Sequence, residues 1–428
     1  MIENKISKVH GRMVFDSRGT PTIEAEVKLE NNIITKSIAP SGASTGKNEA
    51  LEKRDFGKSY LGKSVFDNIK KINENINNAL VGLNVNDQHK IDMTLLELDG
   101  TTDKSKLGAN TTIAVSMAIL KAAAKNENKD LWKYLSNDKK CLLPLPEVQI
   151  IGGGMHAKGS ISVQDFLIIP NGTNNFLEGL EWIHKVYMKA GELLFEKNNL
   201  RGVADEGGYW PNFKTNELVL DFISECISKS GFKEMSDISI SLDIAANSFS
   251  DKNGHYKLGK ELITGNDLLS LLLKWVDSYP IISIEDPFAE GDLHLFTQLK
   301  SKIPSYLQLV GDDLVTTNTK LIKKAHSVNA INGVLIKPNQ IGTITETKEA
   351  VTCSDKLGLM NIMSARSGDT EDAIISDLSV GWGIKQLKVG SFSRSERMCK
   401  WNQCIRIGEK LKDNYQMYEV DSLNWSKL

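Results

Sequence analysis

Residues 307–337 read LQLVGDDLVTTNTKLIKKAHSVNAINGVLIK and hold two apolar runs with an amphipathic segment between them. The runs, 307–310 and 333–336, have the length and composition of buried strands. The segment at 318–326 spaces its apolar residues as one face of a helix does. A strand, a helix of this length and a second strand predict a βα unit, from which parallel sheets are built.

The same rhythm runs from about residue 160 to the end of the chain. Further apolar runs lie at 238–244, 281–284, 359–363 and 387–392, and helical patterns lie at 264–278, 294–303, 344–357, 369–380 and 395–411. At least six consecutive units in one direction favour a closed barrel over an open sheet.

The N-terminal third of the chain has a different pattern. Strand signals within 12–29 are broken at 16–19, a loop of small residues follows at 41–46, and helical patterns lie at 64–80, 86–97 and 110–126. Strands followed by helices predict a compact α+β domain. The segment 142–146, Leu-Leu-Pro-Leu-Pro, is a plausible boundary because its prolines interrupt any helix. We therefore predict an α/β protein with an N-terminal α+β domain over 1–136 and a catalytic barrel over 142–428.

Composition excludes several classes of protein. The chain has 428 residues, 52 Lys and Arg against 54 Asp and Glu, and a net charge of −2, so no overall cationic field would hold nucleic acid. No apolar run is long enough to cross a membrane, and residues 1–5 lack the apolar stretch of a signal peptide. Five scattered cysteines without a C-x-x-C pair indicate neither a disulfide framework nor a zinc site. A large cytoplasmic enzyme is the expectation.

Charged side chains stand at or just past the ends of the predicted barrel strands. They are, in chain order, Asp243, Glu285, Asp312, Lys337, Arg366 with Ser367, and Lys388. In a βα barrel these positions open onto the face where active sites lie. Strand ends are often polar simply because they meet solvent. Contact with solvent would account for one to three such residues, but it accounts poorly for three carboxylates followed by three cations.

This set of residues favours one kind of chemistry. Asp243, Glu285 and Asp312 offer hard oxygen ligands, which favour Mg²⁺ over zinc or copper. The cations that follow would bind an anionic substrate group. Two neighbouring lysines close to a dication should lose proton affinity, so that one of them can act as a base. Proton abstraction next to a carboxylate fits these parts better than acyl or hydride transfer.

A further carboxylate is presented by the turn at 204–208, Ala-Asp-Glu-Gly-Gly. Paired glycines allow a sharp turn, and Tyr209 and Trp210 suggest a poorly hydrated setting. A carboxylate there could have a raised pKa and serve as a general acid. An acidic surface turn is the ordinary alternative.

Several motifs together resemble the enolase (phosphopyruvate hydratase) family and occur in the family's order from residue 12 to about 409. They are FDSRG at 15–19, SGASTG at 41–46, DEGG at 205–208, SIEDPF at 283–288, GDDL at 311–314, NQIG at 339–342 and SRSER at 393–397. The resemblance implies an atypical TIM-type αβ barrel with a small α+β cap. It also implies Mg²⁺-dependent interconversion of 2-phospho-D-glycerate and phosphoenolpyruvate in glycolysis, through a metal-stabilised enediolate. A dimer or a ring of dimers is implied as well.

The resemblance also implies a role for each matching residue. Lys337 would be the base and Glu206 the acid that helps hydroxide leave. The first Mg²⁺ would be held by Asp243, Glu285 and Asp312, and a second by Ser44, on a loop that closes over the site. The phosphorylated carboxylate substrate would be bound by His156, Gln164, Asp165, Arg366, Ser367 and Lys388.

The chain departs from the family pattern mostly at the rim of the site. Ala365 stands where the family has histidine, Asp165 where it has glutamate, Gly159 where it has asparagine and Val389 where it has threonine, and Asn247-Ser248 replaces Ser-Glu. Drift with activity retained is one interpretation. A paralogue acting on a related phospho- or phosphono-carboxylate is the second. A catalytically silent binding or structural protein is the third, and it would predict damaged ligands, acid or base, which are all intact.

Overall fold

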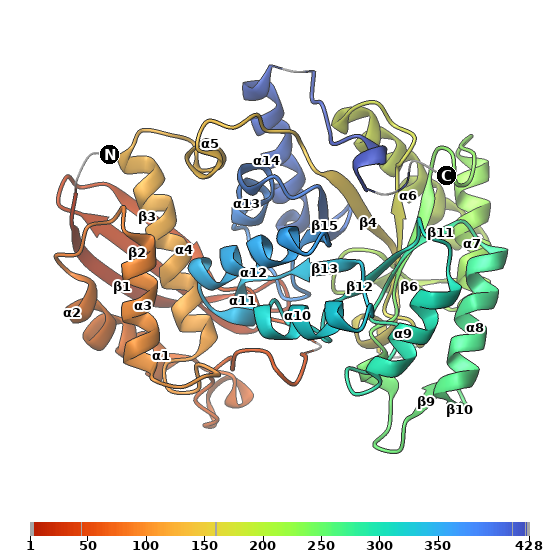
Figure 1. Cartoon of the computed structure of the whole chain (residues 1–428), viewed down its shortest axis with the longest axis horizontal. Helices are drawn as coiled ribbons and strands as arrows, with labels where there is room; N and C mark the ends of the chain where they lie inside the picture. The colour runs from red at the N-terminus through yellow and green to blue at the C-terminus, as the bar shows by residue number, and fades with distance from the viewer. Residues whose placement is uncertain (1–3, 44, 159–160, 413, 424, 426–428) are drawn as a thin grey trace.

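The computed structural model describes residues 4–43, 45–158, 161–412, 414–423 and 425. Ser44 and Gly159, both named above, lie outside the described residues. An N-terminal domain and a larger barrel lie against each other (Figure 1). Among the described residues, no helix combines the length and apolar content needed to cross a membrane.

The N-terminal domain is an antiparallel sheet followed by helices, as predicted. Its strands are β1 (Ile6–Phe15), β2 (Pro21–Leu29) and β3 (Ile34–Ile38), in that spatial order. Its helices are α1 (Phe66–Lys71), α2 (Asn77–Leu80), α3 (Gln88–Asp99), α4 (Ala109–Asn126) and α5 (Leu131–Ser136), with a π-helical turn (Ile72–Ile76) joining the first two. Nearly every residue of α4 is buried, because its alanines let it pack closely on β2 and β3. The strand β3 was not predicted.

Eight strands close into a barrel, which confirms the predicted fold class. They are β4 (Leu145–Gly152), β5 (Asp165–Ile169), β8 (Ser239–Asp243), β11 (Ile281–Glu285), β12 (Gln308–Gly311), β13 (Gly333–Ile336), β14 (Met360–Ser364) and β15 (Gln386–Ser391). The barrel closes because β15 pairs with β4 as well as with β14. The six strands from β8 onward are parallel, but β5 runs antiparallel to both of its neighbours, β4 and β8.

Helices surround the barrel (Figure 1). They are α6 (Phe176–Glu196), α7 (Asn216–Lys229), α8 (Gly265–Ser278), α9 (Leu293–Lys302), α10 (Thr319–Ser327), α12 (Ile344–Lys356), α13 (Ile374–Trp382) and α14 (Ser395–Leu411), with a short α11 (Pro338–Ile341) after β13. Two hairpins are added, β6 (Leu200–Val203) with β7 (Tyr209–Pro211), and β9 (His255–Leu258) with β10 (Glu261–Thr264). Both hairpins and the helices α6 and α7 were not predicted.

One predicted helix begins later than expected. The pattern at 369–380 corresponds to α13, which begins at Ile374. The segment before it is held in a loop by the buried Asp369, which accepts hydrogen bonds from the Arg366 amide at 3.2 Å and the Lys400 ammonium at 2.5 Å. This loop carries Arg366 and Ser367 to the mouth of the barrel.

The N-terminal domain lies against the carboxyl ends of the barrel strands. Ser41 pairs its backbone with Gly368, exchanging two hydrogen bonds of 2.8 Å. Arg18 donates from one terminal nitrogen to the carbonyls of Ser41 and Gly42 at 3.2 and 3.3 Å. The loop at 41–46 is therefore held over the end of the barrel at which the charged strand-end residues lie.

Candidate active site

The carboxyl ends of β8, β11 and β15 converge on one buried ammonium group. The Nζ atom of Lys388 lies 2.9 Å from Oδ2 of Asp243 and 2.6 Å from Oε2 of Glu285. All three side chains are buried, and closure of the barrel brings Lys388 to carboxylates that lie 145 and 103 residues earlier in the chain. Gln164 joins this group, since its Nε2 donates to Oδ2 of Asp243 at 3.2 Å.

The next two strands supply a second buried ion pair. The Lys337 ammonium, just past β13, contacts Oδ2 of Asp312, just past β12. The other oxygen of Asp312 accepts a hydrogen bond of 2.8 Å from Gln340 on α11. The structure thus brings the strand-end carboxylates and lysines into contact as pairs of opposite charge. The sequence pattern led us to expect that these groups meet at one end of the barrel.

The contacts of the two lysines with carboxylates act against the lowered pKa values that the sequence analysis expected for lysines beside a dication. Burial acts to lower the pKa of Lys337, but the Asp312 carboxylate outweighs it, so the pKa is raised. Burial acts in the same direction on Lys388, where Asp243 and Glu285 raise the pKa well above its ordinary value. The expectation considered only repulsion between cations, whereas each lysine is in direct contact with a carboxylate.

Asp165, His156 and Glu206 form a buried triad. Nδ1 of His156 lies 2.9 Å from Oδ1 of Asp165, and its Nε2 lies 3.8 Å from Oε1 of Glu206. Burial acts to lower the pKa of His156, but the two carboxylates raise it to about 9. The imidazole is therefore a cation at neutral pH.

Glu206 has the raised pKa that its glycine-rich turn suggested, because it is buried and lies near Asp165. The turn requires glycine at position 207, where φ is +96° and a Cβ atom would lie 2.8 Å from the Ser393 carbonyl. The Gly207 carbonyl is fixed by hydrogen bonds from Tyr187 at 3.0 Å and Ser393 at 2.6 Å.

Three residues of this region were missed by sequence reasoning. Gln149 on β4 donates to Asp165 and accepts a hydrogen bond of 2.8 Å from the Gly208 amide, so it ties the triad to the glycine-rich turn. Asp286 accepts hydrogen bonds from the amides of Asp312 and Asp313 at 3.0 and 2.6 Å, so it shapes the end of β12. Nothing in the sequence around Gln149 marked it as a site residue, whereas Asp286 stands inside the SIEDPF motif. The third residue is Glu49, which follows the loop at 41–46 in the chain.

Arg366 and Ser367 both face that loop. Nη1 and Nη2 of Arg366 donate to the two carboxylate oxygens of Glu49 at 3.0 and 3.2 Å. Oγ of Ser367 accepts a hydrogen bond of 2.7 Å from the Ala43 amide. The loop is thus closed onto the barrel on both sides of Ser44, whose own position lies outside the described residues.

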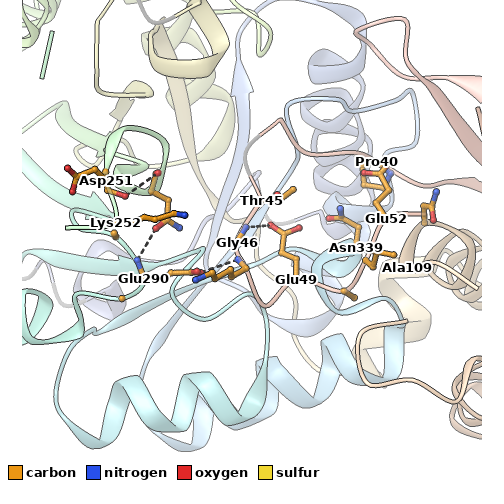
Figure 2. Close-up of a pocket in the computed structure, with 18 residues that line it drawn as sticks. Pro40, Thr45, Gly46, Glu49, Glu52, Ala109, Asp251, Lys252, Glu290 and Asn339 are labelled. Atoms are coloured by element: carbon orange, nitrogen blue, oxygen red, sulfur yellow. Dashed lines mark hydrogen bonds between the residues drawn. The ribbon is translucent and has the colours of Figure 1, made fainter. Parts of the chain in front are cut away.

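These residues enclose a small polar cavity of about 20 Å³, room for roughly one water molecule. Its lining is formed by Gly42, Ala43, His156, Gln164, Asp165, Glu206, Asp243, Lys337, Ser364, Ala365, Arg366, Ser367 and Lys388. Of the predicted site residues, Glu285 and Asp312 lie just behind this lining, in contact with Lys388 and Lys337 respectively. A larger cleft of about 770 Å³ lies beside it, between the N-terminal domain and the barrel (Figure 2).

The donor set of the site suits a hard divalent cation. Within the part of the chain that is described, Oε1 of Glu285 is buried without a hydrogen-bond partner. Burial and the neighbouring Asp243 carboxylate raise the pKa of Glu285 well above its ordinary value. A cation bound between the two carboxylates would relieve this repulsion. Carboxylates without cysteine favour Mg²⁺. Among the described residues, two buried groups bring three possible ligand atoms within 4.8 Å of one another, and of the three carboxylates predicted to bind metal they include only Asp312. They are His156, Asp165 and Glu206, and Asp286, Asp312 and Asp313.

Comparison with known proteins agrees with this geometry. Residues 6–135 match the family described as the enolase N-terminal domain, and residues 140–424 match the enolase C-terminal TIM barrel domain. A curated enolase from Ehrlichia canis (strain Jake) is 44% identical over 407 residues, which cover 95% of this chain and 96% of that protein. The chain therefore belongs to the enolase family, the phosphopyruvate hydratases, which are carbon–oxygen lyases acting on a phosphorylated carboxylate.

Proposed function

We propose that the strand-end cavity interconverts 2-phospho-D-glycerate with phosphoenolpyruvate and water, as a step of glycolysis. The observation that carries the proposal is that Lys337 and Glu206 line the same cavity. An elimination needs a base at one carbon and an acid at the leaving oxygen of the next. Membership of the enolase family supports the choice of reaction.

Lys337 would be the base that removes the proton next to the substrate carboxylate, giving an enediolate. It must be neutral to do so, and its contact with Asp312 opposes this. Arg366 and Lys388 act in the other direction, because both cations lower the pKa of Lys337. The balance of these neighbours would set the fraction of enzyme with a neutral base.

Glu206 would be the acid that protonates the departing hydroxide. Its raised pKa keeps the proton that it must donate. His156, held between Glu206 and Asp165, would bring positive charge to the same wall of the cavity.

The remaining polar residues would bind the substrate, with its phosphate and carboxylate groups facing the cations. We assign this role to His156, Gln164, Asp165, Arg366, Ser367 and Lys388. Asp243, Glu285 and Asp312 would hold one Mg²⁺ and Ser44 would help to hold a second. When bound, Mg²⁺ supplies the positive charge that stabilises the carboxylate as it becomes an enediolate.

A paralogue with an altered substrate is the second candidate, because two of the departures from the family pattern line the cavity itself. Ala365 and Asp165 replace larger residues there. Asn247, Ser248 and Val389 do not line the cavity. Val389 is buried, and its backbone carbonyl accepts a hydrogen bond of 3.0 Å from Arg397, a contact that does not depend on the choice between valine and threonine.

The test is formation of phosphoenolpyruvate from 2-phosphoglycerate by pure protein in millimolar Mg²⁺, followed by ultraviolet absorbance. We expect turnover that disappears when the metal is chelated. If 2-phosphoglycerate is inert but a phosphonate analogue is consumed, the paralogue is correct. If neither reacts, the silent-protein interpretation replaces both. The replacement Ala365→His gives a further test. A large gain in rate would show that the native cavity is impaired for 2-phosphoglycerate, whereas no gain would favour drift with activity retained.

We also propose three features of the whole protein. The domains extend over 1–136 and 142–428, and prolines at the junction support this division. The cytoplasm is the site of action, since all five cysteines are free thiols. The chain forms a homo-oligomer, a dimer or a ring of dimers. In support, Tyr60 contacts Phe15 edge-on and Phe66 at a tilt on the N-terminal domain, while each of the three rings remains about half exposed.

A further inference from the structure

Glu49 forms a buried, two-pronged ion pair with Arg366 across the junction between the N-terminal domain and the barrel. The two carboxylate oxygens each accept one hydrogen bond from the guanidinium, at 3.0 and 3.2 Å. The exposed fractions of the two side chains are 8% and 4%, so neither charge is screened by water. Such paired hydrogen bonds fix the orientation of an arginine as well as its position.

The same carboxylate also holds the loop at 41–46 and the β13–α12 connection. Oε1 of Glu49 accepts a hydrogen bond of 3.1 Å from the Gly46 amide, which Figure 2 shows as a dashed line. It also accepts one of 3.3 Å from Nε2 of Gln340, a residue that donates to Asp312 as well. One side chain therefore connects the end of the closing loop with Arg366 and, through Gln340, with Asp312.

The barrel holds this segment from a second side. Glu290, in the connection after β11, accepts a hydrogen bond of 3.1 Å from the Lys47 amide. The Glu290 amide in turn donates to Asn247 at 2.9 Å, and Asn247 donates to Asp313 at 2.9 Å. The segment at 46–49 is thus fastened where the loop ends, and Asn247, one of the departures from the family pattern, takes part in that fastening.

Glu49 and Arg366 face different spaces. Arg366 lines the small catalytic cavity, and Glu49 does not. Glu49 lines the larger cleft between the domains, and Arg366 does not (Figure 2). Glu49 therefore holds the guanidinium from behind and leaves its cavity side to the substrate's anionic group, rather than taking the place of that group.

We propose that Glu49 is a positioning residue: it aligns Arg366 for the anionic group of the substrate and fastens the closing loop through Gly46, so that loop closure and anion binding are coupled. This inference rests on the proposed function, in which Arg366 binds substrate. Closure of the loop then excludes water from the cavity and orients the Arg366 guanidinium at the same time. Closing loops in enzymes combine these two effects.

The test compares Glu49→Gln, which keeps the shape but removes the charge, with Glu49→Asp and with Glu346→Gln. Glu346 forms another carboxylate–cation pair between the domains, with Lys104 at 2.7 Å, but does not contact Arg366. We expect Glu49→Gln to raise KM for 2-phosphoglycerate about tenfold or more, because misalignment of a charge-paired binding group has effects of this size. Glu49→Asp should give an intermediate KM, and Glu346→Gln should leave KM unchanged. A lower KM in Glu49→Gln would show that Glu49 competes with substrate and would overturn the proposal.

Two further measurements separate this inference from the proposed function. In Glu49→Gln, hydrogen exchange of the peptide covering 41–49 should accelerate, and calorimetry should show weaker binding of inorganic phosphate, while Tm stays close to that of Glu346→Gln. If the wild-type protein turns over 2-phosphoglycerate but exchange, phosphate binding and KM are all unchanged in Glu49→Gln, the positioning role is wrong and the proposed function stands. If the wild-type protein is inactive, the proposed function fails, and exchange and phosphate binding still decide the role of Glu49.

Discussion

Buried charges at this active site are compensated in pairs by residues of the chain itself. Lys388 lies between Asp243 and Glu285, Lys337 contacts Asp312, and His156 lies between Asp165 and Glu206. An uncompensated charge in this setting would cost several kcal/mol, so each cation lies beside at least one carboxyl group. Substrate and cation can then bind by exchanging partners with groups that are already in place.

Lys337→Ala tests the assignment of the base at the scale of one side chain. We expect loss of exchange of the substrate's carbon-bound hydrogen with solvent, by a factor of about 10² or more, because the acceptor atom is removed. The measurement is loss of deuterium label from 2-phosphoglycerate, followed by NMR. Lys323→Ala, on the exposed side of α10, is the control and should exchange normally. Exchange retained in Lys337→Ala, with far-ultraviolet circular dichroism unchanged, would assign the base elsewhere.

Among the structural elements, every barrel strand from β8 to β15 places at least one side chain at or beside the site, and helices connect these strands. α8, which precedes β11, shows how local sequence specifies such a helix. Oγ1 of Thr264 accepts a hydrogen bond of 3.2 Å from the Asp267 amide, and Asp267 accepts one of 2.9 Å from the Thr264 amide. This reciprocal pair satisfies two donors that the first turn of a helix leaves without partners.

Thr264→Ala should lower the free energy of unfolding by about 1 kcal/mol, the usual cost of a lost helix N-cap. Urea denaturation followed by circular dichroism measures it. Thr264→Ser keeps the hydroxyl and should remain near wild type. Because Thr264 lies far from the cavity lining, kcat should not change. Equal stability of the alanine and serine variants would mean that the cap contributes nothing to α8.

At the scale of the whole molecule, the site depends on how firmly the N-terminal domain is seated on the barrel. Lys121 on α4 reaches Asp372, just before α13, with Nζ–O distances of 2.6 and 2.7 Å. Asp372 also accepts a hydrogen bond of 3.2 Å from the Ile38 amide in β3. Burial acts to raise the pKa of Asp372, but Lys121 outweighs it, so the pKa is lowered.

Lys121→Met should destabilise the protein at pH 7 by about 2 kcal/mol, less than for a fully buried pair because Lys121 is 24% exposed. A carboxyl group with a lowered folded pKa stabilises the fold above its unfolded pKa of about 3.9, and that contribution is lost as pH falls through the folded value. The difference between wild type and Lys121→Met should therefore shrink below about pH 4. Urea denaturation across pH measures it, with Lys125→Met, one turn along α4, as the control. A difference independent of pH would assign the loss to packing.

The fold could be predicted from the sequence because its units are specified locally. Apolar runs and helical patterns placed the six parallel strands from β8 to β15 and the helices α8, α9, α10, α12 and α14 within a few residues, since strand and helix periodicity depend on neighbours in the chain. The same reasoning did not predict β5, whose antiparallel direction is set by its pairing with β4 and β8. The short β3 was missed for the same reason, because its pairing with β2 supplies most of its order.

The order of residues alone places these chemical groups at the barrel's strand ends, because a side chain's place on a strand follows from its position in the chain. Which charges touch depends on how the chain folds back on itself. The fold placed Asp312 on Lys337, a contact that acts against the lowered lysine pKa expected from the sequence. It also placed Glu49 on Arg366, 317 residues away. Pairing energies depend on distance and on the exclusion of water, and both are set by how the two domains pack.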